Sequence, residues 1–134
     1  MNYVELAVAL NELDWLEQFI PSCIRKIPKS QQKEVEALAM ANLYFGRKNY
    51  PEALTFMRAT KSKDEQLELR IRMLYCKIFY MNGSNDALES MLKSFDTYLR
   101  RSGIFQQDIV SAYLNFLKLL RLLIDVQHHD KLKK

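Results

Sequence analysis

The residues best suited to metal chemistry lie near the end of the chain. His128 and His129 stand between Asp125 and Asp130, and imidazole and carboxylate groups are both ordinary metal ligands. A metal site needs three or four ligands held in fixed positions. This group sits just ahead of a lysine-rich tail and lacks a further rigid ligand. We therefore interpret it as a solvated helix end, and we expect no metal and no cofactor.

A second chemical candidate is the thiol of Cys76. A nucleophilic cysteine needs an activating base, usually a histidine, and both histidines lie about 50 residues further along the chain. Cys76 and Cys23 are the two cysteines of the chain, too few for a disulfide framework. We interpret both as small buried hydrophobic residues and expect a cytoplasmic location.

The motifs that usually identify an enzyme are missing from the sequence. There is no glycine-rich phosphate loop, no His-Glu-x-x-His, no Cys-x-x-Cys and no Gly-x-Ser-x-Gly. Acidic pairs such as Asp64 and Glu65 fall at predicted helix starts, where carboxylates stabilise the helix dipole. We expect a protein that is not an enzyme.

The basic excess raises the alternative of nucleic-acid binding. The chain has a net charge of +4, yet no basic block of five or six residues occurs. Arg100 and Arg101, with Arg121, form the one local cationic cluster that merits a test. The competing interpretation is a helix C-terminus, where cations are favourable.

Composition predicts an all-α protein. The 134 residues are 49% hydrophobic and include only three glycines and three prolines, which leaves few turn signals and favours long helices. The longest apolar stretch, 116–126, is interrupted by Lys118, Arg121 and Asp125, so we expect no membrane span. Apolar periodicity and helix-end signals predict about seven helices, at 2–10, 12–27, 30–46, 50–60, 65–81, 86–101 and 105–127.

An internal recurrence organises these helices. Ala53, Leu54 and Met57 recur 34 residues later (87 − 53), as Ala87, Leu88 and Met91. A period of about 34 residues with a small residue early in a helix is typical of helix–turn–helix repeats.

Residues 34–101 resemble two tetratricopeptide repeats. Ala41, Tyr44, Tyr50, Ala53 and Met57 match the family's pattern of small, aromatic and large residues, whereas the second copy departs from it at Tyr75 and Ile78. The resemblance implies one domain over 1–134, a right-handed antiparallel helix-pair solenoid with units at 34–67 and 68–101, a degraded unit at 1–33 and a terminal helix at 105–127. It also implies a concave face that binds a peptide or helix, lined by Asn42, Phe45, Arg72, Cys76 and Phe79.

The stretch from Asp86 to Phe116 is also similar to the C-terminal helical-repeat region of larger, uncharacterised bacterial proteins. This resemblance implies that the chain is a piece of a longer solenoid. It implies no particular function.

The terminal helix has too few polar residues for a solvated end. Its polar residues form one narrow stripe, so neighbouring helices would cover only part of its apolar surface. We expect partial exposure of Leu119, Leu120, Leu123 or Ile124, and hence self-association or docking of an upstream segment; the alternative is a helix fully enclosed within the monomer. The sequence thus predicts a non-catalytic interaction or scaffolding module with a protein partner, with a nucleic-acid-binding or regulatory domain as the alternative.

Overall fold

The computed structural model describes residues 2–58, 60, 62–101 and 103–133. Within these ranges the chain forms seven helices and no strand, which confirms the predicted all-α class. The helices are α1 (Asn2–Ala9), α2 (Leu13–Ile24), α3 (Lys29–Gly46), α4 (Tyr50–Arg58), α5 (Glu65–Asn82), α6 (Asn85–Arg101) and α7 (Gln107–Lys133).

The predicted boundaries agree with these helices to within a few residues, except at the end of the last one. α7 continues to Lys133, past the predicted end at 127, because no glycine or proline follows Gly103 to stop it. Pro21 lies inside α2 and does not end it.

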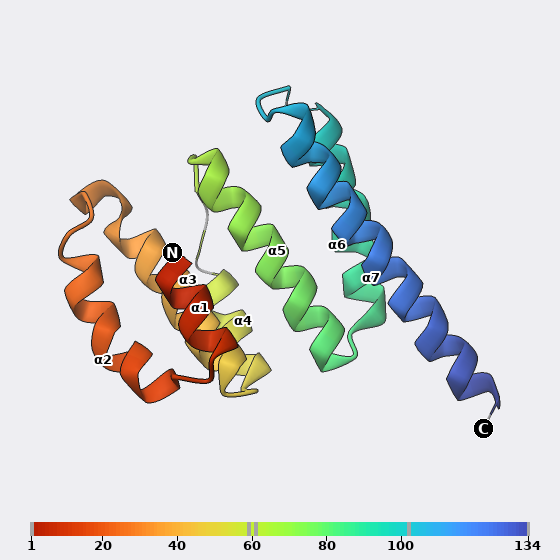
Figure 1. The fold of residues 1–134 in the computed structure, drawn as a ribbon, viewed down its shortest axis with the longest axis horizontal. Helices are drawn as coiled ribbons and strands as arrows, with labels where there is room; N and C mark the ends of the chain where they lie inside the picture. Colours follow the sequence, from red (N-terminus) through yellow and green to blue (C-terminus); the bar gives the residue numbers. More distant parts are fainter. Residues whose placement is uncertain (1, 59, 61, 102, 134) are drawn as a thin grey trace. The chain divides into compact units, whose positions relative to one another are not determined.

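The chain divides into two compact units, Met1–Ile78 and Phe79–Lys134, with the boundary inside α5. The first unit holds α1 to α4 and most of α5, and the second holds the end of α5 with α6 and α7; the helices are labelled in Figure 1.

In the first unit, α3 lies between two hydrophobic clusters. Ala39 and Leu43 of α3 pack in one cluster with buried side chains of α1 and α2. Leu38 and Ala41 pack in the other, with buried side chains of α4 and α5. Since consecutive residues of a helix point in different directions, a helix buried on both sides must be apolar on more than one face, and the sequence of α3 has this property.

The contact between α3 and α4 depends on small residues. Ala41 and Ala53 are both completely buried, and a methyl side chain lets two helix backbones approach closely. Beside them the Tyr44 and Phe56 rings stack with centroids 5.5 Å apart. The turn between the helices ends at Asn49, whose Oδ1 accepts a hydrogen bond from the Glu52 N–H at 3.4 Å, the contact that an N-cap residue makes.

Burial does not follow the sequence recurrence. In α4 the buried residues are Ala53 and Met57, whereas in α6 their counterparts Ala87 and Met91 are half-buried and Leu88 is buried instead. The helix of the second copy, α6, therefore turns a different face toward its packing partners than α4 does. Residues at equivalent sequence positions differ in burial as a result.

Substituting the two recurring alanines tests this difference. We expect Ala53→Leu to lower the free energy of unfolding by about 1–3 kcal/mol, because the added atoms overpack a closed contact. Ala87→Leu should cost less, because Ala87 is only half-buried. Chemical denaturation of both variants measures the difference, and equal losses would contradict the burial of these positions.

The second unit is built on the packing of α6 against α7. The buried residues of α6 alternate at spacings of four and three, the pattern of a coiled-coil seam; they are Leu88, Leu92, Phe95 and Leu99. The Phe95 ring lies 5.8 Å from the Tyr113 ring of α7. One face of α7 is therefore buried against α6.

Three helices end in the same hydrogen-bonded motif. After α1, the Glu12 N–H donates to Ala7 O and the Asn11 N–H to Val8 O, with Asn11 at φ 59°; this is the Schellman arrangement. Asn11 stands three residues before Asp14, a spacing that by itself predicts an N-cap for α2. The structure shows this prediction to be wrong, because a left-handed residue ending α1 cannot also adopt the extended conformation of a cap, and the residue that precedes α2 is Glu12.

The other two motifs follow α3 and α5. Their left-handed residues are Lys48, at φ 61°, and Gly83, at φ 73°. Gly46 is the last residue of α3, at the end predicted from the sequence. Its missing side chain also leaves space for Leu13, because a Cβ at this position would lie 2.7 Å from Leu13 Cδ2.

These conformations predict opposite effects of substitution. Lys48→Gly should raise the free energy of unfolding by roughly 0.5–1 kcal/mol, because glycine adopts a positive φ without steric cost. Gly83→Ala should lower it by about as much, since no atom lies within 4 Å of the added Cβ and only the backbone conformation is affected. Thermal denaturation of the two variants provides the measurement, and shifts of the same sign would contradict it.

Candidate interaction surfaces

Two residues of the predicted concave face are buried. The Asn42 amide donates a hydrogen bond from Nδ2 to Leu38 O at 2.9 Å, so its polar group is used inside the helix. Cys76 has no exposed surface. Neither side chain offers surface to a partner in this structure.

The other three residues of that face are half-buried. The Phe45 ring lies 5.9 Å from the Tyr50 ring and packs on the cluster of α3, α4 and α5. Arg72 donates from Nε to Glu68 Oε1 at 3.0 Å, one turn earlier in α5. Phe79 belongs to the second unit. The first unit thus uses Phe45 and Arg72 largely for its own packing and pairing.

Burial raises the pKa of the Cys76 thiol to about 12, and the positive charge of Arg72 and a backbone hydrogen bond oppose this rise. We expect a thiol reagent at pH 8 to modify Cys23, which is partly exposed, and to leave Cys76 protonated and unmodified until the protein unfolds. A Cys23→Ser variant should then show no fast-reacting thiol. Rapid modification of Cys76 in the folded protein would contradict its burial.

The same shift affects stability at alkaline pH. Folding holds the thiol protonated, whereas the unfolded chain ionises it near its ordinary pKa of about 8.5. The contribution of the Cys76 thiol to the free energy of unfolding is therefore constant below about pH 8.5, and it is lost as the pH rises toward 12.

The structure places the three candidate leucines and the candidate isoleucine of α7 on two different faces. Leu119 is 60% exposed and Leu123 46% exposed, as predicted, whereas Leu120 is 6% exposed and Ile124 8% exposed. Exposure was expected for this group, and for Leu120 and Ile124 the structure corrects it. They lie three and seven residues after Leu117, which is also buried, and this spacing places them on the buried side of the helix.

The exposed apolar face of α7 is wider than the sequence indicated. Leu122 and Val126 are also more than half exposed, and with Leu119 and Leu123 they stand at positions i, i+3, i+4 and i+7. We call these four residues the α7 ridge.

A second apolar surface lies between α1 and α2. A groove of about 320 Å³ is lined by Tyr3, Leu6, Ala7, Leu10, Glu12 and Trp15. Its large apolar side chains are mostly exposed, Trp15 at 49% and the others at more than half. We call this surface the α1–α2 groove.

Stacked aromatic rings hold one wall of the groove in place. The Trp15 ring stacks on Phe19 with centroids 4.6 Å apart, and Tyr3 meets the same Phe19 edge-on at 6.4 Å. Such pairs are stabilising beyond their buried area. This groove was not predicted from the sequence. The available signal was that the α1 region is apolar on two faces, with Val4 and Ala7 inside and Leu6 and Leu10 outside.

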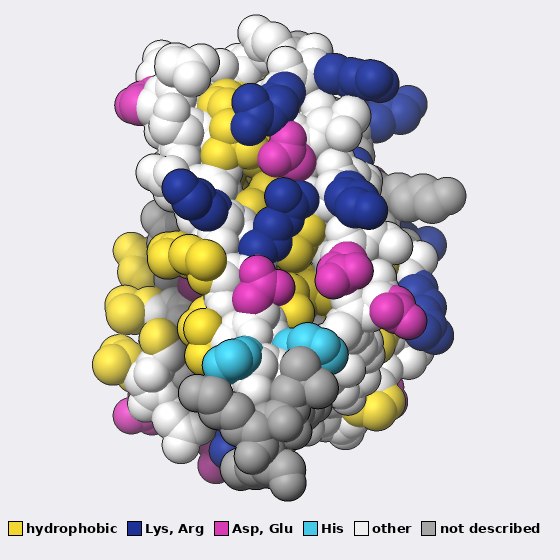
Figure 2. Space-filling view, turned by 90° about the vertical axis from the view of Figure 1, so that its right-hand side faces the viewer, with side chains coloured by type: hydrophobic (Ala, Val, Ile, Leu, Met, Phe, Trp, Pro, Cys, Tyr) yellow, Lys and Arg dark blue, Asp and Glu magenta, His cyan; other side chains and the backbone are white. Residues whose placement is uncertain are grey.

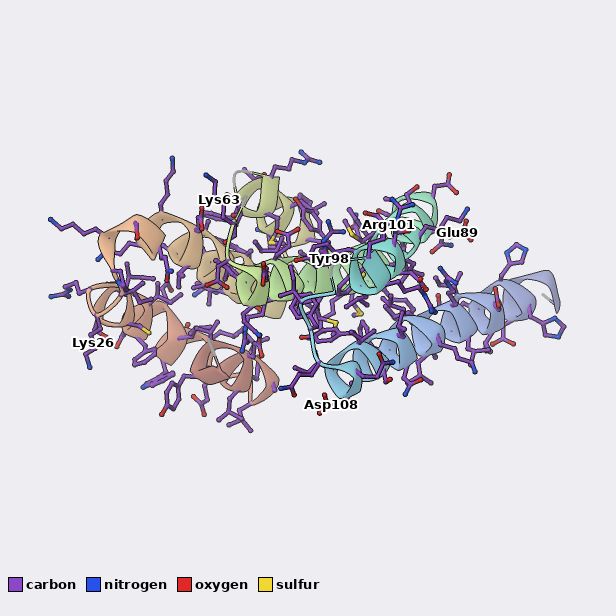
Figure 3. All side chains as sticks on the ribbon, turned by 90° about the horizontal axis from the view of Figure 1, so that it is seen from above. Lys26, Lys63, Glu89, Tyr98, Arg101 and Asp108 are labelled. Atoms are coloured by element: carbon purple, nitrogen blue, oxygen red, sulfur yellow. The ribbon has the colours of Figure 1, made fainter. Side chains whose placement is uncertain are left out.

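The cationic cluster expected near the end of α6 is partly neutralised. Arg100 donates from Nε to Asp96 Oδ1 at 2.6 Å, and both line a hollow with Lys118 and Arg121. Arg101, at the exposed end of α6, is labelled in Figure 3.

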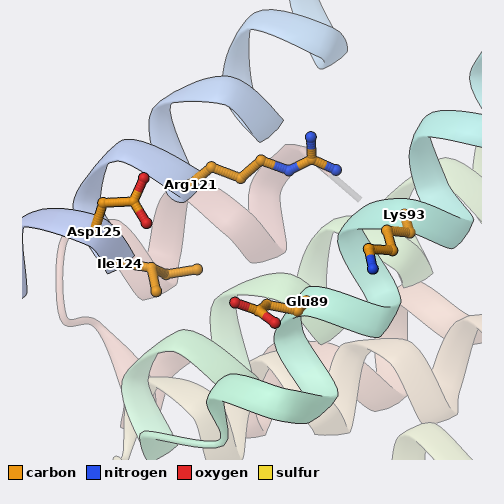
Figure 4. A pocket seen from close by; sticks show the side chains of 5 residues that line it. All are labelled: Glu89, Lys93, Arg121, Ile124 and Asp125. Atoms are coloured by element: carbon orange, nitrogen blue, oxygen red, sulfur yellow. The ribbon is translucent and has the colours of Figure 1, made fainter. Parts of the chain in front are cut away.

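A neighbouring hollow of about 280 Å³ likewise mixes the two signs of charge. Glu89 and Lys93 project into it from α6, and Arg121, Ile124 and Asp125 from α7, as Figure 4 shows. Lys and Arg side chains alternate with Asp and Glu on this side of the molecule (Figure 2). The arrangement lacks the unbroken positive surface that phosphate binding favours.

His128 and His129 lie exposed near the end of α7 (Figure 2). Among the residues that the structure describes, no three His, Cys, Asp or Glu side chains come together as a metal site. In the same part of the chain, no helix has the length and apolarity needed to cross a membrane.

The chain was compared with protein-family models, with curated proteins and with solved structures, and none of the three comparisons finds a match.

Proposed function

We propose that this chain is a non-catalytic protein–protein interaction or scaffolding module that assembles through its end helices. The observation that carries the proposal is the α7 ridge, an exposed apolar row on a helix whose opposite face is already packed. Exposed apolar patches of this kind commonly mark interaction sites.

The spacing of the ridge suits recognition of one helix by another surface. Side chains at i, i+3, i+4 and i+7 form a continuous stripe, the pattern by which an amphipathic helix lies in an apolar groove. Fully burying a leucine contributes about 1.5–3 kcal/mol, so covering four such side chains favours association even after the entropy of binding is subtracted.

A tetratricopeptide-like, right-handed solenoid architecture is part of the proposal. It is supported by the 34-residue recurrence and by the small residues Ala41 and Ala53 at the contact of α3 and α4. A cytoplasmic location is also proposed, because free cysteines suit a reducing compartment.

The end helices are preferred over the concave face as the place of binding. Asn42 and Cys76 are buried, and Arg72 is paired with Glu68. By contrast, Leu119 and Leu123 are free to lose water when a partner binds.

The proposal is tested by comparing what the immobilised chain and its variants retain from a cell extract. A Leu119→Glu/Leu123→Glu variant should lose proteins that the natural chain retains. A Gln18→Glu/Ser90→Glu variant adds the same charge at exposed polar positions and should keep them. Identical retention by all three chains would refute the proposal. Salt-dependent retention of RNA or DNA, with a slope of several phosphate contacts, would instead favour the nucleic-acid alternative.

A further inference from the structure

The chain carries two exposed apolar surfaces of opposite shape. The α7 ridge is a convex row on one helix, and the α1–α2 groove is a hollow of about 320 Å³ lined mainly by apolar side chains. That volume is within the range of about 300–1,000 Å³ typical of binding pockets. A row of leucine side chains is the kind of surface that an apolar groove accepts.

One charge at the edge of each surface is of opposite sign. The stretch from α1 through α2 carries four carboxylates and no lysine or arginine. Three of them already pair within the chain, Glu5 with Arg70, and Asp14 and Glu17 with Arg47, so Glu12 is the carboxylate best placed to meet a cation of a partner. Glu12 lines the groove itself. On α7 the exposed Lys118 stands one turn before Leu122, so a cation flanks the ridge where it would face the acidic helices.

We propose that the α7 ridge of one copy binds the α1–α2 groove of a second copy, so that chains assemble head to tail. This proposal rests on the proposed function and names its partner. The groove supplies Trp15 and Tyr3, held by their contacts with Phe19, and rigid aromatic residues of this type dominate binding energy at interfaces. Lys118 pairs with Glu12, which lines the groove.

A symmetric pairing of two α7 helices explains less of the structure. It would set one convex ridge against another and leave the groove exposed. Head-to-tail pairing covers both surfaces with one contact. Such a heterologous interface repeats from copy to copy, and it therefore gives a series of oligomers that grows with concentration unless the ring closes.

The decisive experiment mixes two variants that are each defective in one surface. The groove variant is Leu6→Glu/Leu10→Glu, and the ridge variant is Leu119→Glu/Leu123→Glu. All four positions are exposed, so the helix content measured by circular dichroism should stay that of the natural chain. Sedimentation should show oligomers for the natural chain and for the Gln18→Glu/Ser90→Glu control. Each surface variant alone should associate about tenfold more weakly or worse.

An equimolar mixture of the two variants should form a 1:1 heterodimer and nothing larger. In that pair the intact ridge of the groove variant binds the intact groove of the ridge variant, while the two altered surfaces repel each other through their added carboxylates. Leu122→Glu provides a second ridge variant if the double substitution disturbs folding.

Three results would overturn the proposal. One is a natural chain that stays monomeric at high micromolar concentration; another is a groove variant that associates as well as the natural chain, which indicates pairing of α7 with α7. The third is a mixture that stays monomeric. If proteins from the extract still depend on Leu119 and Leu123 in any of these cases, the proposed function stands and its partner is a different protein.

Discussion

Replacing Phe95 by alanine is expected to lower the free energy of unfolding of the second unit by about 3–5 kcal/mol. Phe95 is completely buried in α6, and its ring contacts Tyr113 of α7 at a centroid distance of 5.8 Å. Truncation removes the aromatic contact and leaves a cavity in the middle of the α6–α7 seam. Urea denaturation followed by far-ultraviolet circular dichroism measures the loss.

Two further variants make this result specific. Phe95→Leu should be milder than Phe95→Ala, because it keeps most of the apolar volume. Leu119→Ala, at low protein concentration, should change the free energy of unfolding by about 0.5 kcal/mol or less, since Leu119 is exposed. Similar losses for Phe95→Ala and Leu119→Ala would contradict the burial of Phe95 between α6 and α7 and the exposure of Leu119.

Leu38→Ala is expected to cost about 2–5 kcal/mol in the first unit. Leu38 is completely buried in the cluster that joins α3 to α4 and α5, so three helices lose contacts when its side chain is truncated. Its backbone carbonyl, which accepts the Asn42 amide, is unaffected by the change, and the loss therefore reports packing alone. Thermal and chemical denaturation provide the measurement.

Leu54 offers the matched control for Leu38. It packs against the same cluster but is only partly buried, so Leu54→Ala should cost clearly less. A loss for Leu54→Ala as large as that for Leu38→Ala would show that α4 carries more of the core than its burial indicates.

The helices themselves follow from local sequence. A cap such as Asn49 and a break such as Gly83 act within a few residues, and the 3.6-residue period of apolar residues is independent of what the helix packs against. Local signals fail where a left-handed residue is not a glycine. Lys48 adopts a positive φ because the chain must turn between two helices that are held together by tertiary packing.

The interaction surfaces were predictable only in part. Sequence periodicity indicated that α7 has more apolar surface than one neighbour can cover, and this led to Leu119 and Leu123. The same periodicity wrongly included Leu120 among the exposed residues. Neighbouring positions on an apolar helix cannot be told apart from the sequence, because the helix packed against them determines which face is buried. The α1–α2 groove could not be predicted, because it exists only where side chains of two helices, Leu6 and Trp15 among them, border the same space.

The sequence by itself therefore determined the all-α class, about seven helices with their approximate limits, and an excess of apolar residues on the last helix, since these depend on interactions between residues a few positions apart. Tertiary structure decided which of the recurring residues are buried and which remain on the surface. Ala53 and Ala87 occupy equivalent places in the sequence, yet only Ala53 is completely buried. The physical reason is that burial depends on the orientation of each helix toward its neighbours, and that orientation is set by the packing of side chains far apart in the chain.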